Sequence, residues 1–458
     1  MTDTATTETT DAVLEELDAW LADNWDPELT VREWWERLGT AGWSAPNLPV
    51  NAFGRGLPRN DAVRVGQAID RFGALPAPGG LGLLLAAPTI ATHGTQEQID
   101  RYVGDIVTGR QSWCQLFSEP SAGSDLAGLQ TRAIRDGDEW IVNGQKVWTS
   151  NGQKADLGML LARTDPGVPK HQGITYFALE MVQPGVDIRP LREMTGRALF
   201  NEVFMTDARV PDAAVIGGRN QGWAVANTTL ANERAGLGSG GGSAAGSVAI
   251  PGTVGGDLDR RAGDFVAARP AKGGGNGKTG AAKAGRSDDP EDESAMRRAM
   301  GGGAKLLIDL AARNGAAKDP LVRQGLAQLY TWSELGRFNG LRLKAAKQAG
   351  TDIPGMPNIS KLSMSHIMRL SRDLGLQIAG PAGMLHAYHG RDRASLEGAV
   401  TDPAVHFVTE LALLAQAPPI YGGTDQIQRN IIGERVLGLP KEPNNDRTTA
   451  FADLPKNA

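Results

Sequence analysis

Apolar residues recur every three to four positions through the first quarter of the chain. Proline and glycine punctuate the segments between them, and the clearest periodic stretches are 13–21, 31–38, 61–72, 80–92 and 96–108. This spacing places apolar side chains on one face of a helix. We therefore predict a helical domain over residues 1–110, of which the first ten are expected to be disordered.

Between residues 111 and 218 the pattern changes to alternation of apolar and polar residues. The stretches 158–162, 174–181 and 202–204 are predicted as strands. Within residues 140–148, Asn143 and Gly144 are flanked by apolar residues, which is typical of a two-residue hairpin turn. We predict a sheet domain over 111–218 that contains a hairpin about this dipeptide.

Helical spacing returns at Gly222, and a second helical domain is predicted over residues 219–440. Residues 243–303 interrupt it with dense glycine, alanine and charged residues, and glycine costs roughly 1 kcal/mol per residue in a helix. This stretch is predicted to be a flexible insert, and residues 441–458 a tail. The predicted fold class is α+β, with a sheet domain between two helical ones.

Composition bounds the kind of protein. The chain has 458 residues, 41% hydrophobic and 22% charged, which is enough for two or three domains with cores of their own. With 47 basic against 52 acidic residues and no dense basic run, nucleic acid is not an expected partner. The single cysteine, Cys114, excludes an intramolecular disulfide and a cysteine-cluster metal site, and we expect a buried apolar role rather than a catalytic thiol.

Neither targeting nor metal signals stand out. The N-terminal residues are acidic and threonine-rich, without the basic start and apolar core of a signal peptide. The longest apolar run, 81–91, is short and contains Pro88, so no membrane span is expected and the cytoplasm is the default compartment. His386 and His389 have no acidic or cysteine partner at ligand spacing, so no metal site is expected.

The stretch 116–151 carries the densest candidate chemistry. Its first part, Ser-Glu-Pro-Ser-Ala-Gly-Ser-Asp at 118–125, is a loop by composition. The stretch offers backbone N–H groups, several hydroxyls and an indole. The side chains are those of Ser118, Ser121, Ser124, Trp148, Thr149 and Ser150. Such a surface suits a flat, polar-edged ring and its phosphates, although a hairpin with ordinary turn residues accounts for the stretch about equally well.

Two motifs in this stretch resemble the acyl-CoA dehydrogenase family. The flavin-cradling segment of that family runs T/S-E-P-x-x-G-S-D and is followed by K-x-W-x-T/S-N, and this chain has both, at 118–125 and 146–151. The resemblance covers roughly residues 12–440, with the insert as its one large interruption. It implies FAD as cofactor and an acyl-CoA thioester as substrate, oxidised to the 2,3-enoyl-CoA. It also implies an electron-transfer flavoprotein as the partner that reoxidises the flavin.

The resemblance further implies a catalytic carboxylate. Many family members carry it in a Tyr-Glu-Gly-Thr turn near the C-terminus, where this chain has Tyr-Gly-Gly-Thr at 421–424 and Gly422 in place of the glutamate. A second subgroup, resembling the isovaleryl- and long-chain enzymes, carries it on the first helix after the sheet domain, just ahead of an arginine. That place holds Glu233 and Arg234 here, so Glu233 is the expected base. The alternative is a glutamate with only a surface or helix-pairing role.

Residue-by-residue transfer gives the rest of the expected site. Phe117 and Ser118 would meet the pyrimidine edge of the flavin, and Trp148 would flank the ring. Ser150 would donate to flavin N5. The remaining contacts to the dinucleotide are expected from Ser124, Gln377, Gly380, Thr424 and Gln426. The expected substrate contacts are Ser124, near the pyrophosphate or CoA, Arg234, and Gly422, whose backbone N–H would hold the thioester carbonyl.

Two segments depart from the family pattern. The family's R-x-x-F-G arm, which reaches FAD across a dimer interface, is replaced by LAARNGAAKDPLVRQ, with Arg313 as its nearest remnant, and Gly-Gly-Asn-Gly is replaced by Gly-Pro-Ala-Gly at 380–383. Two assemblies follow as expectations: a homo-oligomer, or a heterotetramer in which a related subunit supplies the missing arm. The alternatives to a dehydrogenase are a non-catalytic or site-sharing subunit, and an acyl-CoA oxidase or flavin monooxygenase on the same fold. The small residues at 235–242 fall where the family lines its acyl pocket, so the resemblance implies room for a branched or sterol-derived acyl group.

Overall fold

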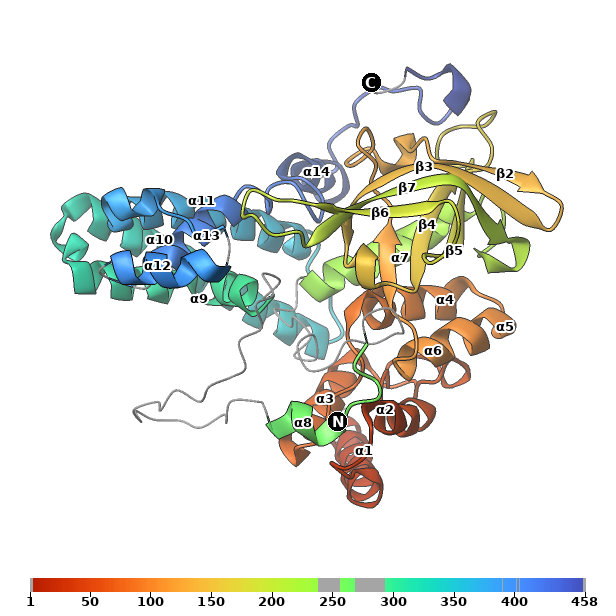
Figure 1. Ribbon diagram of the computed structural model, residues 1–458, viewed down its shortest axis with the longest axis horizontal. Helices are drawn as coiled ribbons and strands as arrows, with labels where there is room; N and C mark the ends of the chain where they lie inside the picture. Colours follow the sequence, from red (N-terminus) through yellow and green to blue (C-terminus); the bar gives the residue numbers. More distant parts are fainter. Residues whose placement is uncertain are drawn as a thin grey trace.

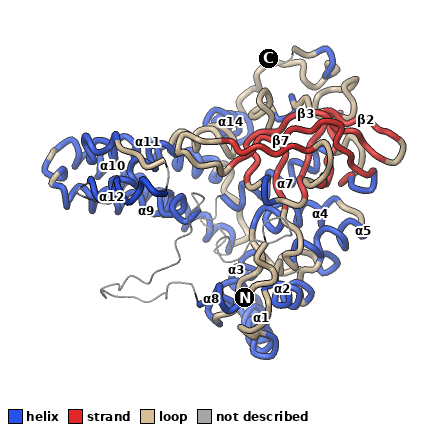
Figure 2. Tube along the Cα trace, viewed as in Figure 1, coloured by secondary structure: helices blue, strands red, loops and turns tan. Residues whose placement is uncertain are grey.

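A mixed sheet lies between two groups of helices. The computed structural model describes residues 3–237, 256–267, 293–388, 390–400, 402 and 404–455. The N-terminal helices lie on one side of the sheet and most of the C-terminal helices extend away on another (Figure 1). Figure 2 shows the same division, with all strands gathered in one block. The α+β class predicted from the sequence is confirmed.

The N-terminal helices bury a group of tryptophans. These helices are α1 (Asp3–Asn24), α2 (Val31–Thr40), α3 (Arg59–Phe72), α4 (Ala87–His93), α5 (Gln96–Gln98) and α6 (Gly104–Val107). The π-helical turn η2 (Gly82–Ala86) precedes α4, and η3 (Ile99–Val103) precedes α6. Trp34, Trp35 and Trp43 are buried, and Thr30 and Glu33 form a capping box that starts α2. Residues 3–10 belong to α1, where we expected disorder.

The sheet has eight strands. They are β1 (Trp113–Leu116), β2 (Arg132–Asp136), β3 (Glu139–Ser150), β4 (Leu157–Arg163), β5 (Ile174–Glu180), β6 (Val186–Leu191), β7 (Phe200–Pro211) and β8 (Val215–Ile216). Their order is β6-β7-β3-β2-β4-β5-β8, and β1 pairs with β4 in parallel. β4 and β5 are buried along almost their whole length, which explains their continuous apolar runs.

The prediction of a hairpin turn at Asn143 and Gly144 is wrong. β3 runs through both residues, and the hairpin that does form joins β2 to β3 at Gly137, whose φ of 63° suits glycine. Gly144 lies at a register shift between β3 and β7, and a Cβ there would come within 2.7 Å of the Cα of Thr131. This glycine therefore permits close approach of two chain segments rather than a reversal.

The C-terminal half is helical. α7 (Gly222–Leu237) lies between the sheet and the N-terminal helices (Figure 1). The other helices are α9 (Glu293–Asn314), α10 (Pro320–Gln348), α11 (Met356–Ala379), α12 (Gly390–Ala399), α13 (Ala404–Leu414) and α14 (Asp425–Ile431), followed by the π-helical turn η9 (Ile432–Val436). Leu307, Leu374 and Val408 belong to the shared core of α9, α11 and α13. Within the described residues, none of the helices combines the length and apolar character needed to cross a bilayer.

Part of the predicted flexible insert is helical and packed. Residues 256–267 contain α8 (Ala262–Ala267), and Leu258 and Ala262 join the tryptophan core of the N-terminal helices. Arg261 forms an antiparallel bridge with Thr30. α9 also begins inside the predicted insert, at Glu293. The remaining parts of the insert, 243–255 and 268–292, lie outside the described residues, as do residues 238–242 before it.

A loop of the sheet domain fixes the position of the C-terminal helices. Between β6 and β7, residues 192–199 reach α13, where buried Arg197 pairs with buried Glu410. Next to this pair, Nε2 of His386 lies 2.9 Å from the carbonyl oxygen of Thr195. A buried ion pair holds two elements together because neither charge can leave its partner without remaining desolvated.

Glu410→Gln should destabilise the protein by about 3–5 kcal/mol, because it leaves the Arg197 guanidinium buried without a counter-charge. Urea unfolding followed by circular dichroism measures the effect. The matched control is Asp309→Asn, which removes the exposed pair with Lys305 and should move the unfolding midpoint little. Equal effects of the two variants would contradict the anchoring role of Arg197 and Glu410.

Candidate active site

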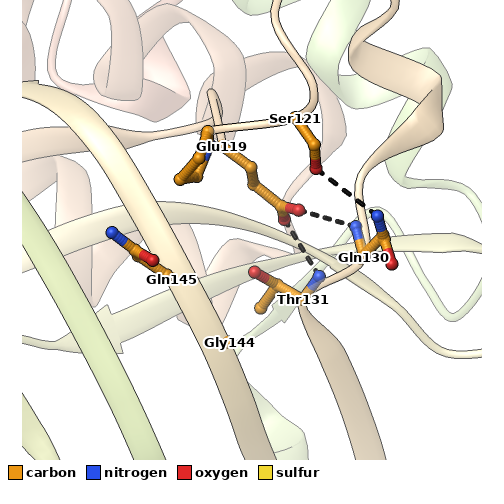
Figure 3. Close-up of a pocket in the computed structure, with 7 residues that line it drawn as sticks. Glu119, Ser121, Gln130, Thr131, Gly144 and Gln145 are labelled. Carbon is orange, nitrogen blue, oxygen red and sulfur yellow. Dashed lines mark hydrogen bonds between the residues drawn. The ribbon is translucent and has the colours of Figure 1, made fainter. Parts of the chain in front are cut away.

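A buried ion pair joins the two motifs of the stretch 116–151. Glu119, in the loop after β1, lies 2.8 Å from Lys146 on β3, and both side chains are almost completely buried. Lys146 also donates to the carbonyl oxygen of Phe117 at 3.0 Å. The backbone N–H groups of Gln130 and Thr131 donate to the Glu119 carboxylate (Figure 3). Each charge therefore has polar partners that replace water.

Burial and charge act in opposite directions on Glu119. Burial alone would raise the pKa of this carboxyl, but the positive charge of Lys146 and the hydrogen bonds that Glu119 accepts outweigh it, and the pKa lies below its ordinary value. Glu119 is thus ionised at neutral pH. Beside it opens a hollow of about 390 Å³, lined by Glu119, Pro120, Ser121, Gln130, Thr131, Gly144 and Gln145 (Figure 3). The loop after β1 is thus anchored on one side by the Glu119–Lys146 pair and borders the hollow on the other.

The two motifs lie side by side. The N–H of Val147 donates to the carbonyl oxygen of Ser118 at 2.9 Å, which places the end of β1 against β3. Phe117 is buried, whereas Ser118 is half-buried and Ser124 is exposed. The hydroxyls of the first motif thus reach the surface of the sheet domain.

The second motif presents Trp148 at an irregularity of β3. The register of β3 with β7 shifts between Lys146 and Thr149, and Trp148 adopts a left-handed conformation with φ of 62°. Its side chain is 58% exposed and meets Phe200 edge-on, with 5.7 Å between ring centroids. A bulge re-aims a side chain that regular alternation would direct elsewhere. Trp148 therefore stands out from the sheet, close in sequence to half-buried Ser150.

Helix α7 brings Glu233 to strand β1. Oε2 of Glu233 lies 3.5 Å from the side-chain nitrogen of Gln115. Gln115 is three residues before Ser118, which is about 10 Å along an extended strand. The helix is fixed against α4 by the contact of His93 Nε2 with the Thr228 hydroxyl at 2.7 Å. The carboxylate thus lies beside the strand that leads into the first motif.

A side chain of α14 holds the turn at 421–424 in place. Gly422 and Gly423 have φ of 61° and 81°, a conformation that favours glycine. Buried Gln428 donates to the carbonyl oxygen of Gly422 at 2.9 Å. Thr424 caps the helix by accepting from a backbone N–H of the first turn. The orientation of this turn is therefore fixed by its own helix.

The other predicted site residues lie on the C-terminal helices. Gln377 is exposed near the end of α11, and Gly380 ends that helix with φ of 59°. Gln426 is exposed in the first turn of α14. The side chain of Arg234 and the whole of His389 lie outside the described residues.

Arg313, the nearest remnant of the missing arm, is engaged within its own chain. Its Nε lies 2.6 Å and its Nη2 3.2 Å from the two carboxylate oxygens of Asp402. This hydrogen-bonded pair lowers the pKa of Asp402 and raises that of Arg313. A bidentate pair of this kind orients the guanidinium toward Asp402 rather than outward.

Cys114 is a packing residue. It is fully buried, and its sulfur lies 3.7 Å from that of Met181. Burial raises the pKa of the thiol, which disfavours the reactive thiolate. The buried apolar role expected for Cys114 agrees with these contacts.

Models of one family match successive parts of the chain. The N-terminal, middle and C-terminal domains of acyl-CoA dehydrogenase match residues 2–110, 114–208 and 294–437. The acyl-CoA dehydrogenase IpdE1 of Mycobacterium tuberculosis (strain ATCC 25618 / H37Rv) is 32% identical over 440 residues, which cover 92% of this chain and 96% of the relative. The chain belongs to the acyl-CoA dehydrogenase family. The resemblance carried by the two motifs is confirmed, and the family is one of flavoprotein oxidoreductases.

Solved structures of acyl-CoA dehydrogenases share this fold. The ChsE4–ChsE5 complex from Mycobacterium tuberculosis aligns with a TM-score of 0.58 and 26% identity, covering 95% of this chain and 98% of that chain. The Tcur3481–Tcur3483 steroid ACAD (acyl-CoA dehydrogenase) aligns with a TM-score of 0.62 and 23% identity, also covering 95% of this chain and 98% of that chain. Both alignments span helices and sheet together, so the arrangement in Figure 1 is that of the family.

Three residues that build the site were not predicted to do so. Glu119 and Lys146 stand inside the two motifs, but only the fold reveals that they pair with each other. The available signal was a lysine amid the apolar alternation of a predicted strand, since a buried cation requires an anion. Gln115 carried no signal, because a glutamine before a strand end is ordinary until α7 is placed against it.

Glu119→Gln should lower stability at pH 7 by about 3–5 kcal/mol, since Lys146 then lacks its counter-charge. Because the folded-state pKa of Glu119 is depressed, its contribution is complete above the ordinary carboxyl pKa and is lost as pH falls through the lower folded-state value. Acidification from about pH 5 to pH 3 should therefore destabilise the unaltered protein more than the variant. Urea unfolding across this range measures both, and parallel pH profiles would refute the depressed pKa.

Proposed function

We propose that this chain is an FAD-dependent acyl-CoA dehydrogenase in which Glu233 removes the α-proton of the thioester. The proposal rests on the 3.5 Å contact between Glu233 and Gln115. The chain runs from Gln115 through the end of β1 directly into Phe117 and Ser118, so the carboxylate lies beside the strand that leads to the first motif. A glutamate with only a surface role on α7 would have no reason to face this strand.

The side chains of the two motifs suit FAD. Trp148 offers a flat apolar face, and Ser118 and Ser150 offer hydroxyls nearby, a donor set that matches a ring with a polar rim. When bound, FAD supplies an acceptor for the β-hydride of the substrate. Phe117, Ser118, Trp148 and Ser150 would hold the ring, and Ser124, Gln377, Gly380, Thr424 and Gln426 would hold the remainder.

The chain's own residues would share the acid–base work. Glu233 takes the α-proton, and the negative charge that develops on the thioester oxygen needs a hydrogen-bond donor. The N–H of Gly422 is the proposed donor. Gln428 holds the next peptide through the Gly422 carbonyl, so the turn that carries the Gly422 N–H is ordered before substrate binds, and little reorganisation is required at the moment of reaction.

Glu233→Gln should slow flavin reduction by about 10²–10⁴-fold, because the amide cannot accept the α-proton. The measurement is the loss of flavin absorbance after anaerobic mixing with a CoA thioester, using isovaleryl-CoA and a sterol-side-chain CoA thioester as probes. Glu180→Gln is the matched control, because that exposed glutamate at the end of β5 forms a surface pair with Arg101. Unchanged reduction in Glu233→Gln would rule out Glu233 as the base.

A site-sharing subunit is the second candidate. Two observations support it: Arg313 is engaged by Asp402, which competes with a role as the family's cross-interface arm, and the ChsE4–ChsE5 structure is a complex of two different chains. In this alternative, a related subunit completes the FAD site. The proposed electron acceptor is an electron-transfer flavoprotein in both cases, and an oxidase on the same fold would instead form peroxide in air.

The visible spectrum of the purified chain separates the two candidates. A self-sufficient dehydrogenase should purify yellow, with flavin absorbance near one FAD per chain. A colourless chain that gains FAD only when co-expressed with a related subunit would support the shared site. Asp402→Asn, which releases Arg313, is a useful companion because it should change flavin content only if Arg313 can reach the cofactor.

A further inference from the structure

The C-terminal segment folds back onto the sheet domain. After η9 the chain returns over the sheet (Figure 1), and residues 446–454, here named the C-terminal latch, lie against the β4–β5 loop, residues 164–173. The backbone contacts are Phe451 N–H to Val168 oxygen and Ala452 N–H to Pro166 oxygen, both at 2.9 Å, and a bridge of Ala450 with Pro169. The latch is thus bonded to the loop as an added strand would be.

Phe451 closes over a buried guanidinium. Cζ of Arg163, the last residue of β4, lies 3.7 Å from the Phe451 ring centroid, and the ring is only 8% exposed. Arg163 also donates to the carbonyl oxygens of Ala127 and Leu129, which follow the first motif. Burial lowers the pKa of Arg163 to about 10, so the group is still charged at neutral pH and benefits from the aromatic face.

Lys170 joins the latch to the first motif. Its ammonium donates to Asp125 at 3.0 Å and also to Asp446, and the side chain is only 9% exposed. Burial alone would lower the pKa of Lys170, but the hydrogen bonds and charges of Asp446 and Asp125 outweigh burial and raise it. One buried cation therefore connects the last residue of the motif with the first residue of the latch.

The same loop reaches the start of α7. The ring of His171 meets Trp223 edge-on at 4.8 Å, and the hydroxyl of Thr164 donates to Asn220 at 2.6 Å. Glu233 lies ten residues beyond Trp223, about 15 Å along the helix. The latch, the β4–β5 loop and the end of the first motif at Asp125 thus form one block, which meets α7 about three turns before the proposed base.

We propose that the C-terminal latch positions the CoA end of the substrate, by clamping the β4–β5 loop to the motif loop and so fixing Ser124. This proposal rests on the proposed function, because it takes a CoA thioester as the ligand. Ser124 is exposed and precedes Asp125, so its place depends on the anchor that Lys170 provides. A loop that is already ordered loses less conformational entropy when a ligand binds.

Phe451→Ala and Asp446→Asn should each raise KM for a CoA thioester about tenfold and leave kcat unchanged, because they affect binding and not the proton transfer. The N-acetylcysteamine thioester of the same acid lacks the nucleotide and phosphates of CoA, so its KM should not change. Asp453→Asn is the matched control: this exposed carboxylate lies in the same segment, and the variant should keep the original KM for both thioesters.

Two further measurements do not depend on turnover. Hydrogen exchange in residues 118–131 and 164–173 should become faster in both latch variants, and calorimetric titration with free CoA should show weaker binding. If Phe451→Ala does not fold, the measurements on Asp446→Asn alone decide the test. An equal rise in KM for both thioesters, or unchanged CoA affinity in a folded latch variant, would overturn the proposal.

The failure of each proposal has its own signature. If the unaltered protein oxidises no thioester but the latch variants weaken its binding of CoA, the proposed function fails and the latch stands. If the unaltered protein turns over and the latch variants match it in KM and CoA affinity, the latch fails and the function stands.

Discussion

The site depends on a pair of opposite charges placed where water cannot reach them. Glu119 and Lys146 are 27 residues apart and come from the two different motifs, and each charge has backbone partners. Charges taken out of water cost several kcal/mol each, and only a full set of hydrogen bonds offsets that cost. The motif loop and β3 are consequently held at one spacing, which is the condition for presenting Ser118 and Trp148 together.

Around this pair, each remaining part of the site has an anchor of its own. α7 is held by His93 and faces Gln115 on β1. The turn at 421–424 is held by Gln428, and α14 is tied to α11 by the buried Asp425, which pairs with Lys361 and Arg369. The site is therefore assembled from separately anchored elements, and these polar contacts add to apolar packing such as that of Val225 and Ala226 of α7 in the sheet core.

Much of this arrangement was accessible from the sequence, because it is encoded locally. Helical spacing located α2 and α3, and the letters of the two motifs located the loop and strand that carry the family's chemistry. Local preference misled at Asn143 and Gly144, where a typical turn dipeptide lies within a strand. A glycine that permits close approach and a glycine that reverses the chain look alike until the neighbouring segment, here Thr131, is in place.

What the sequence concealed was long-range. Residues 256–267 belong to a glycine-rich stretch whose average composition hides the apolar anchor at Leu258. The latch was predicted to be a tail, because single charges produce no periodic signal in the sequence. Its contact of Asp446 with Lys170 joins residues that are 276 positions apart. Such contacts are decided by the fold as a whole, so no window of the sequence contains them.

The contact of Arg197 with Glu410 makes the boundary between the sheet and the C-terminal helices a poor hinge. Swinging the two bodies apart would separate a desolvated cation and anion before solvent could reach either one. We therefore expect a large ligand to enter through local fluctuations of side chains and loops, on timescales of nanoseconds to microseconds. Slower opening of whole domains would not be required.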